Sequence, residues 1–400
     1  MKVRYINILL SLILTLAGMS SCVYPFEAEL DGESGTFVIE GDVLIGEVMN
    51  VKLSYTAPIN GSGLFTAPEK ASVWVEDDKG GHYPGTPAHS DRYHPGEFTV
   101  DMTKADPSLK YRLRVDNLET YRSYASSWQA VCRAPQIDSL SYIVDEEKSK
   151  LNIALSMHSQ SGSYFKWSYR EDWEYHSEYS AKIKYLPPVR LTDTWNQGYG
   201  LVVDIVYPEK NHYYCWNYAY SSEIMLFSTE SQTEDRFVDL EFHTIPRDNK
   251  RISVLYHIDV QLEPITKEAY LYWDNIKNNS EYNGNLFAPN PSEMVGNIRC
   301  LNDTTELVMG FINVAERDTQ ELFYNNSKER FYKPKYPFME EPQSVSSSKE
   351  WYSMYSAGYL PYDYEEMGPS PTLWSLKENV DCTCLGGTKN KPSYWPNDHE

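Results

Sequence analysis

The stretch ISVLYHIDVQL, residues 252–262, carries the clearest strand pattern in the chain. Apolar and aromatic side chains occupy every second position, at Ile252, Val254, Tyr256, Ile258, Val260 and Leu262. The positions between them include Ser253, His257, Asp259 and Gln261. Since successive side chains of a strand point to opposite faces, this alternation predicts a strand with one buried face. We therefore expect a mainly β protein.

Residues 35–133 repeat this alternation in shorter segments. Tyr111, Leu113 and Val115 would face a core, while Arg112 and Arg114 would face the other way. The sequence DDKGG at residues 77–81 is typical of a hairpin turn. Short strands at this spacing predict a small antiparallel β-sandwich over residues 35–133.

A second β-rich, sandwich-like domain is expected at residues 134–324, after the proline-containing crossing APQIDSL at 134–140. One short helix interrupts its strands. Thr266 can cap this helix, and Glu268 suits its first turn, where the helix dipole favours an acid. An apolar stripe at helical spacing follows, made of Ala269, Tyr272, Trp273 and Ile276.

Regular patterning fades toward the C-terminus. Residues 325–400 are rich in Tyr, Pro and Ser and contain the C-x-C pair Cys382 and Cys384. So many aromatic residues argue against a fully disordered tail. We expect a long irregular wrap over the second domain.

The N-terminal residues predict export and lipidation. Lys2 and Arg4 precede an apolar run at 6–17, and small residues lead to Cys22. This pattern indicates a signal peptide at 1–21, whose removal would leave Cys22 to be acylated and an acidic tether at 22–34. The alternative is a soluble secreted protein with an incidental cysteine. The apolar run is shorter than the roughly 20 residues of a membrane-spanning helix.

Composition narrows the classes of function. Removal of residues 1–21 would leave a net charge of −23, which argues against nucleic acid as a partner. The chain holds 33 Tyr and 10 Trp, residue types that suit both strands and recognition surfaces. Trp74, between the inward-facing Val73 and Val75, is one candidate for a contact surface, and packing against the second domain is its alternative.

With Cys22 lipidated, five cysteines remain for disulfides: Cys132, Cys215, Cys300, Cys382 and Cys384. Five is an odd number, so at most two disulfides can form. An exported chain permits disulfides, and we favour a disulfide that pins the C-terminal tail over a soft-metal site at the C-x-C pair. The sequence leaves the partner open.

The sequence holds no recognised catalytic, nucleotide-binding or metal-binding motif. Glu171, Asp172 and Glu174 lie among aromatic residues, as in a sugar-cleaving site. We favour the simpler interpretation, in which these acids are solvated at an exposed strand end. No cofactor or metal is expected.

Several short stretches, taken in order, resemble one family. They include CVYPFE at 22–27, FVIEG at 37–41, ASVWVED at 71–77, PQIDSL at 135–140, YCW at 214–216, LFAPNP at 286–291, GGT at 386–388 and KPSYW at 391–395. Together they resemble the Bacteroidetes outer-membrane lipoproteins grouped as domain of unknown function 4249. The resemblance implies an immunoglobulin-like or transthyretin-like N-terminal sandwich. It also implies a TonB-dependent transporter as partner, and it carries over no catalytic residue.

The leading hypothesis is a non-enzymatic lipoprotein of the outer membrane, at the cell surface or on the periplasmic side. It would act with a TonB-dependent transporter in nutrient binding or uptake. A surface adhesin or structural module is the alternative, and a glycan-active enzyme is a further one.

Overall fold

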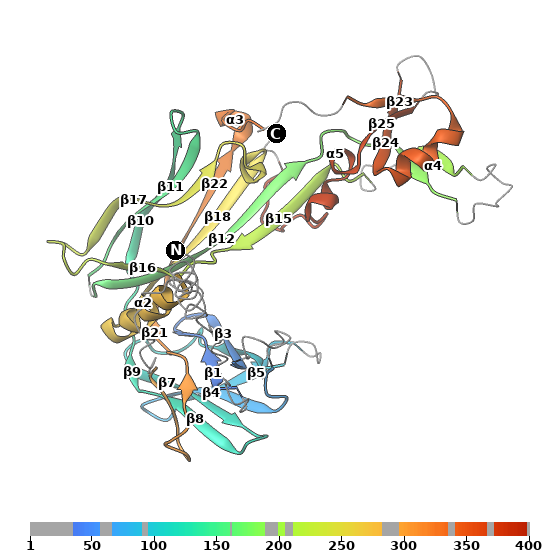
Figure 1. Ribbon diagram of the computed structural model, residues 1–400. Helices are drawn as coiled ribbons and strands as arrows, with labels where there is room; N and C mark the ends of the chain where they lie inside the picture. The colour runs from blue at the N-terminus through green and yellow to red at the C-terminus, as the bar shows by residue number, and fades with distance from the viewer. Residues whose placement is uncertain are drawn as a thin grey trace, which may run out of the picture.

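The computed structural model describes residues 35–56, 66–89, 95–160, 162–188, 199–204, 211–281, 296–334, 341–365 and 372–397. The fold is mainly β, as predicted, and its strands form an N-terminal sandwich, a central pair of sheets and a C-terminal module (Figure 1). Residues 1–34 lie outside the described residues. The signal peptide, the acidic tether and the lipidation of Cys22 therefore stay predictions.

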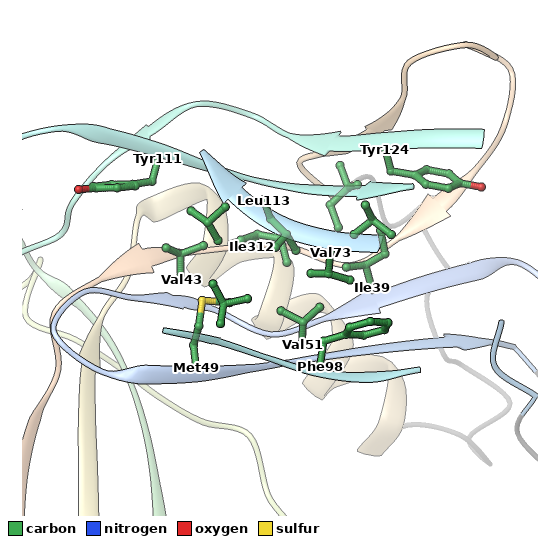
Figure 2. Close-up of a cluster of buried hydrophobic side chains, with 14 of the residues drawn as sticks. Ile39, Val43, Met49, Val51, Val73, Phe98, Tyr111, Leu113, Tyr124 and Ile312 are labelled. Carbon is green, nitrogen blue, oxygen red and sulfur yellow. The ribbon is translucent and has the colours of Figure 1, made fainter. Parts of the chain in front are cut away.

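The N-terminal sandwich is one continuous sheet folded back on itself. Its strands in this part of the chain are β1 (Phe37–Glu40), β3 (Val48–Tyr55), β4 (Ala71–Asp77), β5 (His82–Pro87), β6 (Glu97–Asp101), β7 (Lys110–Asn117), β8 (Arg122–Ser126) and β9 (Gln129–Ala130). β2 (Val43–Leu44) follows β1 in the chain and belongs to a separate two-stranded sheet. β5 pairs with both β4 and β6 and so joins the two layers. Alternate residues from both layers, such as Val51, Val73 and Leu113, fill the core between them (Figure 2).

Three later strands return to this sandwich: β19 (Ile298–Cys300), β20 (Val308–Met309) and β21 (Val314–Ala315). β19 pairs with β8, β20 with β1 and β21 with β2. Ile298 and Ile312 are buried in the N-terminal core. The predicted second domain at 134–324 includes these residues. This boundary is wrong for 296–315, because a long-range pairing of this kind leaves no local signal in the sequence.

The central part packs two sheets face to face. One sheet has the order β10-β11-β17, and the other has the order β15-β12-β18-β22 with β16 beside β12. The elements of this part are β10 (Gln136–Asp145), β11 (Lys150–His158), β12 (Tyr164–His176), β15 (Tyr214–Tyr220), β16 (Met225–Ser228), β17 (Arg236–Pro246), η3 (Lys250–Ile252), β18 (Leu255–Pro264), α2 (Lys267–Glu281), β22 (Asp318–Asn325) and α3 (Asn326–Glu329).

The strand predicted at 252–262 is the central strand β18, paired on both sides along most of its length. Its apolar face is fully buried at Tyr256, Ile258 and Val260. The strand begins at Leu255 rather than Ile252. Asn249 accepts a hydrogen bond from the backbone of Arg251 and caps the short 3-10 turn η3, which takes up the first predicted position, Ile252. A bend at residues 253 and 254 then precedes the strand.

The predicted helix is α2, and Thr266 caps it as expected. The hydroxyl of Thr266 accepts from the backbone N–H of Ala269 at 3.1 Å. Ala269 and Tyr272 are buried with Phe311. The described residues contain four α-helices rather than the single one expected. None of them is long and apolar enough to cross a membrane.

The region predicted to be an irregular wrap holds regular structure. Its elements are β23 (Gln343–Val345), α4 (Ser348–Ser356), β24 (Tyr359–Tyr364), β25 (Thr372–Leu376), α5 (Lys377–Val380) and η4 (Cys382–Leu385). β23, β25 and β24 form a sheet, and the hairpin of β13 (Ile183–Leu186) and β14 (Leu201–Asp204) contacts it. The prediction missed this module because part of its core, Tyr185 with Trp374, comes from a distant segment.

Charged side chains join the sandwich to the central sheets. Lys166 of β12 contacts Asp42 and lies 3.4 Å from Glu263. Arg317 donates to Glu47 at 2.7 Å and also approaches Glu263. Ion pairs in a partly buried junction are weakly screened by salt, so they hold the two parts in one arrangement.

Candidate functional site: an aromatic and acidic sheet face

The acidic cluster of the sequence lies in the middle of β12. Glu171, Asp172 and Glu174 are only 2%, 2% and 1% exposed. β15 pairs with this segment on one side and β18 on the other. The prediction of solvated acids at an exposed strand end is therefore wrong. The sequence could not show it, because charged residues in a strand ordinarily mark its solvent side.

Glu171 points into the space between the two central sheets. Its carboxylate accepts from the Tyr256 hydroxyl at 2.8 Å and from Arg251 Nη1 at 2.6 Å, and it lies 2.9 Å from His243 Nε2. His243 Nδ1 in turn meets the Tyr169 hydroxyl at 3.0 Å. Burial acts to raise the pKa of Glu171, but these hydrogen bonds and the Arg251 charge outweigh it and lower the pKa. Glu171 is thus a paired, ionised structural group.

Asp172 and Glu174 point to the opposite, outer face of the same sheet. Arg170 donates to both oxygens of Asp172, at 2.7 Å from Nη2 and 3.0 Å from Nε. Burial acts to raise the pKa of Asp172, and the neighbouring His257, Arg170 and Tyr394 side chains lower it overall. The hypothesis of three converging carboxylates is wrong, since alternation along the strand separates Glu171 from the other two.

The C-terminal segment is held against this outer face. Glu174 accepts a hydrogen bond from Trp395 Nε1 at 2.7 Å, and Trp395 is almost fully buried. The backbone of Thr388 exchanges two hydrogen bonds with Trp216 of β15, at 2.8 and 2.9 Å. The tail thereby extends the sheet at its edge.

A disulfide between Cys215 and Cys382 pins the same segment. It confirms the prediction that a disulfide pins the C-terminal tail, and it identifies Cys215 as the partner. Tyr175 donates to the Cys382 carbonyl at 2.9 Å beside it. Cys132, Cys300 and Cys384 are free thiols. Within the described ranges, no group of three or more His, Cys, Asp or Glu side chains could hold a metal ion.

Tyrosines stand exposed next to these buried acids. Tyr218 and Tyr220 of β15 are 55% and 64% exposed, and they lie opposite Asp172 and Arg170 in register. The Arg170 guanidinium lies 5.2 Å from the Tyr218 ring and 5.8 Å from the Tyr220 ring. Tyr394 adds a third exposed ring. We call Arg170, Asp172, Tyr218, Tyr220 and Tyr394 the recognition face.

The geometry of this face suits binding. Asp172 fixes the guanidinium of Arg170, so a partner meets a side chain already held in place. Tyr and Arg are over-represented among residues that dominate interface affinity, because they bury large area at low entropy cost. Sequence reasoning missed the face. The available signal was the aromatic residue at every second position of β15, at Tyr214, Trp216, Tyr218 and Tyr220.

Trp74 lies on the outer face of the N-terminal sandwich, while Val73 and Val75 are buried. Its ring is half-buried, and the Arg114 guanidinium covers it at 5.2 Å. The His82 ring lies 5.9 Å from the Trp74 ring. Trp128, which is 40% exposed, packs under Arg112 of the neighbouring strand β7. A role for Trp74 in contacting a partner stays a prediction.

These observations define a mainly β protein of several sheets, with an exposed aromatic face built on a buried ionic framework. The model of the domain of unknown function DUF4249 matches residues 23–321. The chain therefore belongs to this family.

No curated protein matches the chain. Among solved structures, a DUF4785 family protein from Legionella pneumophila is similar over 56% of this chain, with 9% identity and a TM-score of 0.18. The chain covers 51% of that structure. A structure titled as manganese lipoxygenase of Gaeumannomyces graminis with partial zonadhesin of Komagataella pastoris has a TM-score of 0.14 at 9% identity, over 58% of this chain and 89% of that one. TM-scores this low carry no argument about fold or function.

Proposed function

We propose that the chain is a non-enzymatic lipoprotein of the outer membrane that docks on a TonB-dependent transporter through its recognition face, in nutrient binding or uptake. The observation that carries the docking is the Arg170 guanidinium, which Asp172 holds against the exposed rings of Tyr218 and Tyr220. Such a face offers aromatic contact area and one fixed charge-assisted donor.

The charges around the face define the partner's surface. Asp259 pairs with Arg170 across the sheet, and Glu321 pairs with Asp259. The Glu321 side chain is 67% exposed. Acids therefore flank the rings, so the partner would present Lys or Arg beside an apolar patch. Complementary charge of this kind raises the association rate more than the affinity.

The predicted anchor supports the same function. Acyl chains on Cys22 would confine the protein to the plane of the membrane. Confinement raises the effective concentration of the protein near a membrane partner. A contact face of modest area is then sufficient to hold the two proteins together.

The carboxylates argue against the alternative of a glycan-active enzyme built on this cluster. A glycosidase needs a carboxylic acid of raised pKa facing a second carboxylate. Here the pKa values of Glu171 and Asp172 are lowered, and the two groups lie on opposite faces of the sheet. Each already has protein partners that keep it charged.

The test is co-purification from detergent-solubilised membranes. Wild-type chain should recover a TonB-dependent transporter, and the double variant Tyr218→Ala/Tyr220→Ala should lose it. Tyr121→Ala is the matched control, since Tyr121 is 84% exposed on the N-terminal sandwich and lies outside the face. Recovery by the double variant as strong as by wild type would overturn the docking face. Recovery of no transporter by wild type, with altered attachment of a deletion strain, would favour the adhesin.

Localisation is tested separately. Wild type should fractionate with the outer membrane, and Cys22→Ala should be released in soluble form. Proteolysis of intact cells then distinguishes the two leaflets, because only a surface-exposed chain is cut.

A further inference from the structure

A pocket of about 370 Å³ lies in the C-terminal module, away from the recognition face. β13, α4, β24 and α5 form its walls. Ile183, Tyr185, Tyr355, Leu360 and Val380 give it a largely apolar lining. This volume falls within the range of roughly 300–1,000 Å³ that is typical of small-molecule sites.

The walls are held by contacts that need no ligand. Tyr185 packs against Trp374 at 5.6 Å and Tyr355 at 5.2 Å between ring centroids. Trp374 is fully buried and donates from Nε1 to Thr372 at 2.7 Å. The backbone of Lys182 joins β13 to β24 through the Tyr362 carbonyl at 2.6 Å. The cavity is therefore preformed, and a ligand would have little ordering cost to overcome.

Polar groups gather at one part of the lining. His212 Nδ1 lies 2.9 Å from the Asp381 carboxylate, which also accepts from the Thr383 backbone at 3.0 Å. The backbone N–H of Cys382 donates to the His212 carbonyl at 3.0 Å, so this part is tied to the Cys215–Cys382 disulfide. The one carboxylate of the pocket is thus already satisfied by protein donors.

Two lysines complete the lining, Lys184 on β13 and Lys377 on α5. Neither makes an ion pair with a carboxylate among the residues that the structure describes. The lining residues thus carry two lysines against one satisfied carboxylate, a positive balance in a chain whose net charge is −21. A negative group on a ligand would be attracted here and repelled by much of the remaining surface.

We propose that this pocket binds a small amphipathic anion, an organic carboxylate with an apolar body. The body would lie among Tyr185, Tyr355 and Leu360, and the carboxylate would be attracted by Lys184 and Lys377. The proposal does not rest on docking through the recognition face, since no residue is shared between the two sites.

The test uses the full chain in lipid nanodiscs, with empty nanodiscs as the blank, and isothermal titration calorimetry. The probes are 3-phenylpropionate, its neutral amide and the corresponding primary amine. We expect saturable binding of the carboxylate, binding of the amide weaker by about tenfold or more, and no binding of the amine. A preference for the amine or equal binding of the amide would overturn the charge assignment. Absence of binding by all three would overturn the site.

Three variants place the ligand. Leu360→Trp should fill the cavity and abolish binding, and Lys184→Glu/Lys377→Glu should weaken carboxylate binding by about tenfold or more. Lys349→Glu on α4 is the matched control, because Lys349 is exposed and does not line the pocket, and its affinity should equal wild type. Each variant should unfold at the same midpoint temperature as wild type, which would show that its fold is intact. Unchanged binding by folded Leu360→Trp would show that the ligand lies elsewhere and would overturn the proposal.

Discussion

The N-terminal sandwich and the central sheet β15-β12-β18-β22 are both built largely from antiparallel strand pairs, but they bury different side chains. Strands β3, β4 and β7 bury apolar residues at every second position, such as Val51, Val75 and Leu113. β12 buries Glu171, Asp172 and Glu174 in a continuous row with Trp173 and Tyr175. The first pattern is stabilised by transfer of apolar area from water. The second is stable only while each buried charge has an ion-pair or hydrogen-bond partner. Removal of a single partner is therefore strongly destabilising.

The largest expected effect comes from breaking this pairing at Glu171. Glu171→Ala leaves Arg251 and His243 without their buried partner, so the free energy of unfolding should fall by about 3–5 kcal/mol. Leu113→Ala in the apolar core should cost about 2–5 kcal/mol through the cavity it leaves. Urea denaturation measures both. Glu147→Ala, at an exposed acid in the turn between β10 and β11, should change stability by less than about 0.5 kcal/mol. A loss for Glu171→Ala no larger than that for Glu147→Ala would show that the ionic framework is dispensable.

Removal of the disulfide separates the two regions in another way. Cys215→Ser opens a link between positions 167 residues apart, and we expect a loss of about 2–5 kcal/mol. Hydrogen exchange should speed up in β15 and residues 386–395, whereas β3 and β7 should keep their protection. A reducing agent should reproduce this in wild type and add nothing to Cys215→Ser. Equal deprotection of β7 would mean that the two regions unfold as one unit.

Acid should weaken the central sheet through its buried carboxylates. The pKa values of Glu171 and Asp172 are lower in the folded protein than their ordinary values. A lowered folded pKa contributes stability above the unfolded pKa, and this contribution is lost as the pH falls through the folded pKa. Stability should therefore decline below about pH 4. Glu171→Ala should flatten this dependence, as followed by urea denaturation at several pH values, and an unchanged slope would contradict the assignment.

The smallest effect is expected at a helix end between the two regions. Thr266→Ala removes the cap of α2 and should cost about 1 kcal/mol, whereas Thr266→Asn retains an acceptor and should cost little. Thermal unfolding distinguishes them. Equal losses for the two variants would show that the hydroxyl contributes no capping energy.

What could be predicted from the sequence follows from this contrast. Alternation predicted β4, β7 and β18, because a strand with one buried face has apolar side chains at every second position. The same rule failed at β12, where Glu171 is buried by partners from η3, β17 and β18 that no local pattern reveals. The C-terminal module was missed for a related reason. Its core joins Tyr185 to Trp374 across a long stretch of chain.

The candidate site divides in the same way. The acidic cluster and the cysteines of the tail could be identified in the sequence. Their roles could not, because these depend on which strands they contact in the folded protein. Cys215 was one of three possible partners for the tail. Tyr218 and Tyr220 had a visible period of two, yet their exposure follows from what covers the outer face of the sheet, which depends on tertiary structure.

The return of β19, β20 and β21 to the N-terminal sandwich bears on the order in which the protein matures. Domains usually fold one after another as the chain is synthesised, starting with the N-terminal one. Here the N-terminal sandwich is synthesised first, but it lacks three of its strands until the chain has been synthesised as far as residue 315. The edges of β1 and β8 stay open until then, and an open edge invites pairing with another chain. The part made first is thus among the last to close, and truncation at residue 133 would leave it unfinished.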